Sequence, residues 1–87
     1  MFAKKAIDSF VETRIDDELV LMNIDTGSFH ALKGTGLAIW QLLDGGDGRT
    51  DIIAALTKRY DISAEQCGAE VDRFLSDIEA AGFVTLA

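Results

Sequence analysis

One short apolar run constrains the fold of this chain more than any other feature. Leu19–Ile24 is apolar at every position but Asn23, yet it is too short for a helix. It is followed by Asp25-Thr26-Gly27, where glycine can adopt the left-handed conformation of a tight hairpin loop. Ser28–Leu32 is then expected as the returning strand, and Phe10–Ile15 as a weaker first strand that ends at a turn. These segments predict a three-stranded antiparallel sheet.

The middle strand of this sheet is apolar on both faces. Val20, Met22 and Ile24 point one way, while Leu19 and Leu21 point the other. A sheet that helices cover on one side needs only one apolar face. We therefore expect the second face to be covered by the N-terminal segment, by another chain or by a ligand.

Helical spacing replaces the strand pattern after residue 32. Lys33–Gly36 breaks the last strand, and a short, deeply packed helix is expected over residues 37–43. Thr50 is expected to cap a second helix, whose end carries Lys58 and Arg59 where the helix dipole favours cations.

The third helix is the longest that the pattern predicts. Ser63 and Gln66 form a capping box at its start, and Gly82 is its expected stop. Its apolar stripe contains Cys67, Val71, Phe74, Leu75 and Ile78. The residues after Gly82 are expected to be extended. The predicted fold class is α+β and winged-helix-like: a three-stranded antiparallel sheet followed by three helices.

Length and charge limit the number of domains and the partners. The 87 residues allow one domain, 1–87, in which residues 1–9 are expected to be a flexible N-terminal segment. A net charge of −7 disfavours nucleic acid and anionic membrane surfaces. The sequence has neither a signal-peptide pattern nor an apolar run long enough to span a bilayer. A cytoplasmic protein without nucleic-acid or membrane partners is therefore expected.

The residues that carry chemistry are few. Cys67 is the only cysteine and His30 the only histidine, so neither an intrachain disulfide nor a zinc site with several such ligands can form. Cys67 falls on the apolar stripe and is expected to be a buried thiol. No nucleophile with a nearby base and no cofactor fingerprint is present. We expect no catalytic residue, no metal, no cofactor and no enzymatic activity.

Three further features have ordinary structural explanations. Trp40 is expected in the core, because Ile39, Leu42 and Leu43 surround it in the sequence. The glycine-rich segment 44–48 lacks the Lys-Ser/Thr of a phosphate loop and the distal Glu of a calcium loop, and is expected to be a turn. Arg73 and Asp77 have the spacing of a solvated ion pair.

Several blocks in this order resemble the PqqD-like family, also called precursor-peptide recognition elements. The blocks are Glu18–Leu32, Thr35-Gly36 with Ile39–Gly45, Ile52-Ile53 with Leu56 and Tyr60-Asp61, and Val71–Leu75 with Ala81–Phe83. Together they extend over almost the whole chain. The hairpin loop departs from the Pro-Glu-Gly type of the quinone-cofactor branch, so the chain looks closer to the lasso-peptide and other peptide-maturation branches.

The resemblance implies a function and a site. In that family the last hairpin strand and the third helix form a groove, in which the leader of a ribosomally made precursor peptide lies as an added strand. The implied backbone partners of the leader are Ser28, Phe29, His30, Ala31 and Leu32. The implied side-chain contacts are Glu70, Arg73, Phe74, Asp77, Ile78 and Ala81, of which Phe74 and Ile78 could belong to the core instead. A separate modifying enzyme or leader peptidase would receive the peptide.

Two alternatives stay open from the sequence. A winged-helix DNA-binding regulator has the same elements, although its reader helix normally displays clustered Lys and Arg. The third helix here carries Arg73 against Glu65, Glu70, Asp72, Asp77 and Glu79. The doubly apolar middle strand could equally form a homodimer surface.

Overall fold

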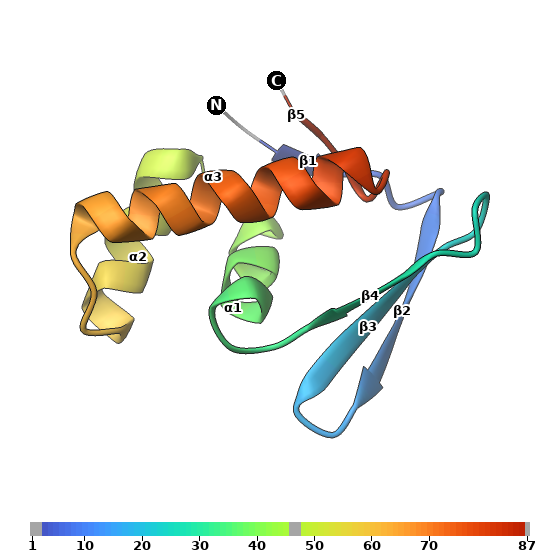
Figure 1. Cartoon of the computed structure of the whole chain (residues 1–87), viewed down its shortest axis with the longest axis horizontal. Helices are drawn as coiled ribbons and strands as arrows, with labels where there is room; N and C mark the ends of the chain where they lie inside the picture. The colour runs from blue at the N-terminus through green and yellow to red at the C-terminus, as the bar shows by residue number, and fades with distance from the viewer. Residues whose placement is uncertain (1–2, 46–47, 87) are drawn as a thin grey trace.

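The computed structural model describes residues 3–45 and 48–86. Its elements, in chain order, are β1 (Ala3–Lys5), β2 (Phe10–Ile15), β3 (Glu18–Asn23), β4 (Phe29–Leu32), α1 (Gly34–Leu43), α2 (Arg49–Arg59), α3 (Ala64–Ala80) and β5 (Val84–Leu86) (Figure 1). The predicted α+β class is confirmed: a three-stranded antiparallel sheet precedes three helices. Strand β5 confirms the extended segment expected after Gly82, whereas β1 was not predicted.

The three-stranded sheet has the order β2-β3-β4. Asp16 begins the turn between β2 and β3 with a positive φ of 53°, and Gly27 in the second hairpin has the expected positive φ of 73°. The register pairs Leu21 with both Glu12 and His30, so these three side chains share one face. Leu19 and Leu21 are buried, which shows that this inner face packs on the helices.

Part of the N-terminal segment forms a short strand. Strand β1 pairs antiparallel with β5 in a separate two-stranded sheet, in which Lys5 lies opposite Val84. The backbone N–H of Ala6 then donates to the carbonyl of Phe83 at 2.9 Å. This segment therefore packs on β5 and, through Lys5, on α1, rather than on the outer face of the larger sheet. Met1 and Phe2 of the expected flexible segment lie outside the described residues.

The helix boundaries confirm some predicted caps and correct others. The hydroxyl of Ser63 accepts a hydrogen bond from the backbone N–H of Gln66 at 3.1 Å, and Gly82 ends the α3 region with a positive φ of 85°. Thr50, however, is not a cap: Gly48 precedes α2, which begins at Arg49. Of the predicted turn 44–48, residues 46 and 47 lie outside the described part.

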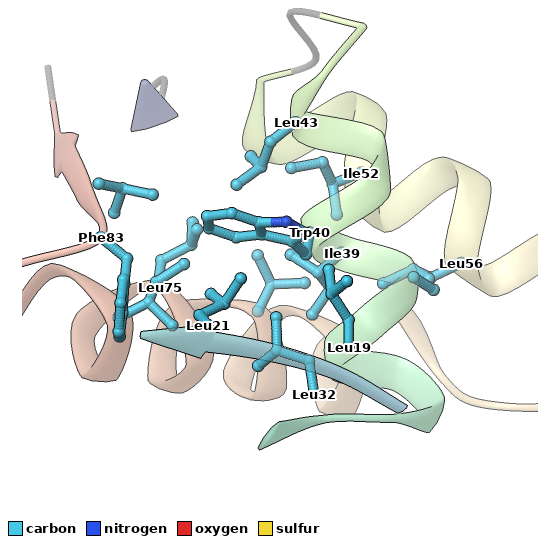
Figure 2. Close-up of a cluster of buried hydrophobic side chains, with 14 of the residues drawn as sticks. Leu19, Leu21, Leu32, Ile39, Trp40, Leu43, Ile52, Leu56, Leu75 and Phe83 are labelled. Atoms are coloured by element: carbon cyan, nitrogen blue, oxygen red, sulfur yellow. The ribbon is translucent and has the colours of Figure 1, made fainter. Parts of the chain in front are cut away.

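A single core lies between the inner face of the sheet and the helices (Figure 2). Trp40 is 1% exposed, which confirms its predicted core position. Its ring packs edge-to-face on Phe10, which in turn packs edge-to-face on Phe83. Cys67 is fully buried, as expected. Within residues 3–45 and 48–86, no helix is both long and apolar enough to cross a membrane.

Candidate functional site

Strand β4 forms one edge of the three-stranded sheet, and its pairing shows which backbone groups are free. The N–H of Asn23 donates to the carbonyl of Ser28 at 2.9 Å. Hydrogen-bonded and non-hydrogen-bonded pairs alternate in an antiparallel ladder, so His30 and Leu32 also direct their backbone groups toward β3. Phe29 and Ala31 direct theirs toward the open edge. A short edge with two such residues can accept an added strand.

The side chains of β4 divide between the two faces of the sheet. Leu32 points inward and is 4% exposed, and His30 is half-buried on the same side. Phe29 and Ala31 point outward and are exposed, Phe29 at 67%. The residues with free backbone groups thus carry the outward side chains.

The His30 ring lies at the inner side of this edge. It packs edge-to-face on Phe83, with 5.4 Å between the ring centroids. Its Nδ1 is buried and hydrogen-bonds to no group among the described residues. The ring is therefore held by apolar packing, while one polar atom stays unsatisfied.

Helix α3 presents one flank along the inner side of β4. The helical period places Glu70, Phe74, Asp77 and Ala81 in one line, with Arg73 beside it. We call these five residues the α3 flank. Phe74 and Ala81 are half-buried, whereas the three charged residues are exposed.

Two contacts show where this flank lies relative to β4. A Cβ on Gly36, which follows the end of β4, would lie 3.2 Å from Cε1 of Phe74. At the other end, the side-chain amide of Asn23 donates to the carbonyl of Ala81 at 2.9 Å. The flank thus contacts the start of α1, which follows β4 in the chain, and the last residue of β3, which precedes the hairpin loop. Among the described residues, no enclosed pocket lies beside the flank.

Asn23 connects these elements, although it was not among the expected site residues. Besides its bond to Ala81, its Oδ1 accepts from the backbone N–H groups of Asp25 and Thr26 at 2.9 and 3.2 Å. Asn23 is 5% exposed. It connects the hairpin loop to the end of α3, and so sets the position of β4 beside the helix. An Asn two residues before the Asp25-Thr26-Gly27 loop was the available signal.

The structure changes part of the expected residue set. Ile78 is fully buried, because it lies two helical turns after Val71 on the core side of α3, so it belongs to the core and not to the flank. Ser28 precedes β4 and its carbonyl is already bonded to Asn23. Arg73 and Asp77 lie on the same flank, but they do not form the ion pair that their spacing predicts.

The titratable groups near α3 have structural roles. Burial raises the pKa of the Cys67 thiol, with a further contribution from the negative charge of Glu70. A protonated, buried thiol is a poor nucleophile. Among residues 3–45 and 48–86, no group of three His, Cys, Asp or Glu side chains could hold a metal ion.

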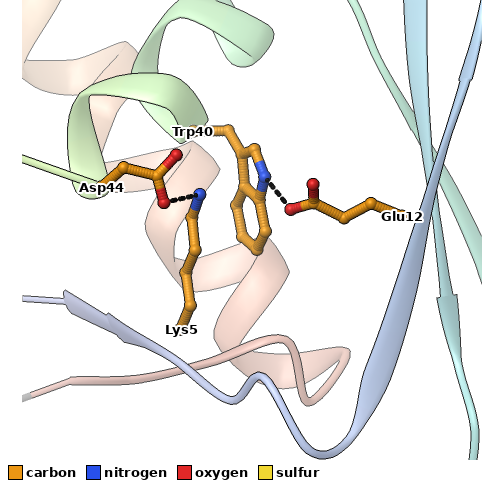
Figure 3. Close-up of polar contacts among 4 residues, drawn as sticks. All are labelled: Lys5, Glu12, Trp40 and Asp44. Carbon is orange, nitrogen blue, oxygen red and sulfur yellow. Dashed lines mark hydrogen bonds and ion pairs between the residues drawn. The ribbon is translucent and has the colours of Figure 1, made fainter.

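A polar cluster on the opposite edge of the sheet was also unforeseen (Figure 3). Lys5 Nζ lies 4.2 Å from the centre of the Trp40 ring and 2.6 Å from Oδ1 of Asp44. Glu12 on β2 accepts a hydrogen bond from the same Trp40 ring. The cluster attaches β1 and β2 to α1 and lies apart from the α3 flank.

Comparison with known proteins places this geometry in a family. The chain resembles TbiB1, solved in complex with the TbiA(beta) leader peptide, at 27% identity and a TM-score of 0.87 over 97% of this chain and 96% of that one. It shares its fold with lasso peptide synthetase B1, solved with the leader peptide, at 17% identity and a TM-score of 0.89 over 99% and 100% of the chains. No curated protein matches the sequence. The family model for coenzyme PQQ synthesis protein D (PqqD) matches residues 18–84, and the chain therefore belongs to the PqqD family.

Proposed function

We propose that this protein binds the leader segment of a ribosomally synthesised precursor peptide as an added strand on the free edge of β4. The observation that carries the proposal is the pair of free backbone positions, Phe29 and Ala31, beside the α3 flank. TbiB1, which has the same fold over nearly its whole length, was solved with a leader peptide. Main-chain hydrogen bonds would provide affinity, and the flank would select side chains.

The second part of the proposal is an adaptor role. The protein presents the bound precursor to a separate modifying enzyme or leader peptidase, and is not itself a catalyst. The buried Cys67 thiol supports this role, as does the packing of the His30 ring on Phe83. The likeness to the two leader-bound proteins favours a lasso-type maturation system.

A binding titration tests the proposal. A fluorescein-labelled peptide with the leader sequence of the precursor encoded beside this gene is titrated with the purified protein, and saturable binding is expected. The ordering of a flexible peptide costs roughly 2–5 kcal/mol, so only part of the contact energy appears as affinity. Removal of one or two main-chain hydrogen bonds should therefore weaken binding strongly. No binding to any leader from the gene neighbourhood would refute the proposal.

The variant Ala31→Pro tests strand addition directly. It removes an N–H that faces the open edge but no N–H that bonds to β3, and proline is tolerated on edge strands. We expect the variant to fold and to bind the leader at least tenfold more weakly. His30→Pro, which removes an N–H bonded to β3, is the matched control and should destabilise the fold. Wild-type affinity in folded Ala31→Pro would exclude β4 as the binding edge.

The peptide offers a complementary test. N-methylation of a leader residue whose N–H bonds to β4 should abolish binding, whereas N-methylation of the next residue, whose N–H points away, should be tolerated. An alternating pattern along the leader is therefore expected. A pattern without this alternation would mean that the leader binds by its side chains alone.

A further inference from the structure

The outer face of the three-stranded sheet carries a continuous apolar row. The register places Val11, Met22 and Phe29 directly beside one another on β2, β3 and β4. Val11 is 44% exposed, Phe29 is 67% exposed, and Met22 is half-buried between them. We call these three residues the outer row. Ile15 and Ile24 extend the apolar surface on either side, at 53% and 55% exposure.

Within residues 3–45 and 48–86, the helices and strands leave Val11 and Phe29 of the outer row exposed. The helices pack on the inner face, where Leu19 and Leu21 are buried (Figure 1). The N-terminal segment, one expected cover, pairs with β5 instead. A large exposed aromatic at the end of an apolar row, next to an open strand edge, indicates a contact surface.

The free edge of β4 determines which group can contact the outer row. Phe29 has its backbone groups directed outward, so a strand added to β4 places one of its residues opposite Phe29. The side chain of that residue stands on the same face as Phe29, about 4.5–5.5 Å away between Cβ atoms. The residue opposite Phe29 on the added strand therefore becomes the fourth member of the outer row.

We infer that the outer row continues into the bound leader, and that the leader residue opposite Phe29 is apolar. This inference rests on the proposed function and adds a selectivity element on the face of the sheet that the α3 flank does not contact. A leader strand has two faces. Its inward side chains meet the α3 flank, and the residue opposite Phe29 packs on the outer row.

The chemistry of the row specifies that residue. Phe29 and Met22 offer an aromatic ring and a flexible thioether without a charged group between them, which favours an aromatic or branched aliphatic partner. An Asp or Lys at the same leader position would place its charge against the exposed ring. We expect about five- to tenfold weaker binding for such a leader, in line with the usual strength of cross-strand and buried apolar contacts.

Phe29→Ala is the first test, with Val11→Ala as its matched control. Both substitutions truncate an exposed apolar side chain of the same row, but Val11 lies two strands away from the open edge. Phe29→Ala should weaken leader binding about five- to tenfold, whereas Val11→Ala should bind like the wild type. Phe29→Leu should restore most of the affinity. Thermal unfolding of each variant verifies that it folds.

A double-mutant cycle then identifies the leader residue. Each apolar leader residue is replaced with Ala in turn and titrated against wild-type protein and Phe29→Ala. One position should show coupling to Phe29, and the others should be additive. Additivity at every position would overturn the inference.

The outcomes separate this inference from the proposed function. If Ala31→Pro abolishes binding but Phe29→Ala does not weaken it, strand addition stands and the outer row has no part in it. If the wild type binds no leader, both fail. A second copy of this chain is the rival occupant of the row. Sedimentation at increasing concentration would reveal it as self-association that Phe29→Ala and Val11→Ala both weaken, with leader binding unchanged, and that result would also overturn the inference.

Discussion

The indole N–H of Trp40 donates a 2.8 Å hydrogen bond to Oε1 of Glu12, which joins the centre of the core to strand β2 (Figure 3). Because Trp40 is 1% exposed, loss of this acceptor leaves a buried donor unsatisfied. We predict that Glu12→Ala lowers the free energy of unfolding by about 1–2 kcal/mol, and Glu12→Gln by less, because its amide oxygen can still accept. Urea unfolding followed by far-UV circular dichroism measures the change.

Glu18→Ala is the control for this prediction. Glu18 forms an exposed ion pair with Lys33 at 3.8 Å, and such pairs contribute about 0–1 kcal/mol. A Glu12→Ala variant no less stable than Glu18→Ala would show that the Trp40 bond does not hold β2 in place.

Asn23 is predicted to control both the stability of the hairpin and the leader site. Asn23→Ala removes the bond to Ala81 and the two loop bonds, so we expect a loss of about 2–3 kcal/mol of unfolding free energy. Asn23→Asp retains an acceptor for the loop but cannot donate to Ala81, and should be at least as unstable at pH 7 because its buried carboxylate faces a carbonyl. Thermal unfolding provides the comparison, with the exposed neighbour Asp25→Ala as control.

The binding readout distinguishes a local from a global effect of Asn23. At a temperature where both variants remain folded, leader affinity should fall, since β4 is no longer fixed beside the α3 flank. Wild-type affinity in folded Asn23→Ala would mean that the position of β4 is set elsewhere.

Local signals explain why much of this fold was predictable. The hairpin follows from an apolar run that ends at Gly27, and the α3 start follows from the Ser63–Gln66 cap, which the structure forms. The pairing of β1 with β5 had no such signal. Each strand is only three residues long, and the partners lie at opposite ends of the sequence. Because β1 and β5 are far apart in the sequence, their pairing depends on where the end of α3 places β5 relative to β1.

The candidate site was predictable in outline for the same reason. The helical period alone places Glu70, Phe74, Asp77 and Ala81 on one flank. It could not assign Ile78 to the core, because the boundary between core and flank depends on how α3 is rotated against the sheet. Which backbone groups of β4 are free depends on the pairing with β3, and a shift of one residue would exchange Phe29 for His30.

We predict that the unsatisfied nitrogen of His30 lowers the stability of the wild-type protein. Its Nδ1 is buried and has no hydrogen-bond partner among the described residues, while its ring packs on Phe83. His30→Phe keeps an aromatic ring and removes the unsatisfied nitrogen, so we expect the free energy of unfolding to rise by about 1 kcal/mol. His30→Ala removes the packing as well and should be less stable than the wild type. Chemical denaturation at pH 7 compares the three proteins, and a destabilised His30→Phe would indicate that the nitrogen is satisfied in solution.

The ion pair between Arg49 and Asp72 predicts a pH dependence of stability. Arg49 Nε lies 2.6 Å from Asp72 Oδ1, and its hydrogen bonds lower the pKa of that carboxyl. A carboxyl whose pKa is lower in the folded protein stabilises it above the unfolded value, about 3.9, and loses that contribution as the pH falls through the folded value. Both side chains are substantially exposed, at 38% and 50%, so screening by solvent should keep the contribution small.

Asp72→Asn tests this pH dependence through its difference in stability from the wild type. That difference should be constant from pH 7 down to about pH 5 and should then shrink toward about pH 2, where both proteins carry an uncharged side chain at this position. It should also decrease in about 1 M salt, which screens exposed charges. A difference that is independent of pH would mean that the charge of Asp72 makes no net contribution to stability.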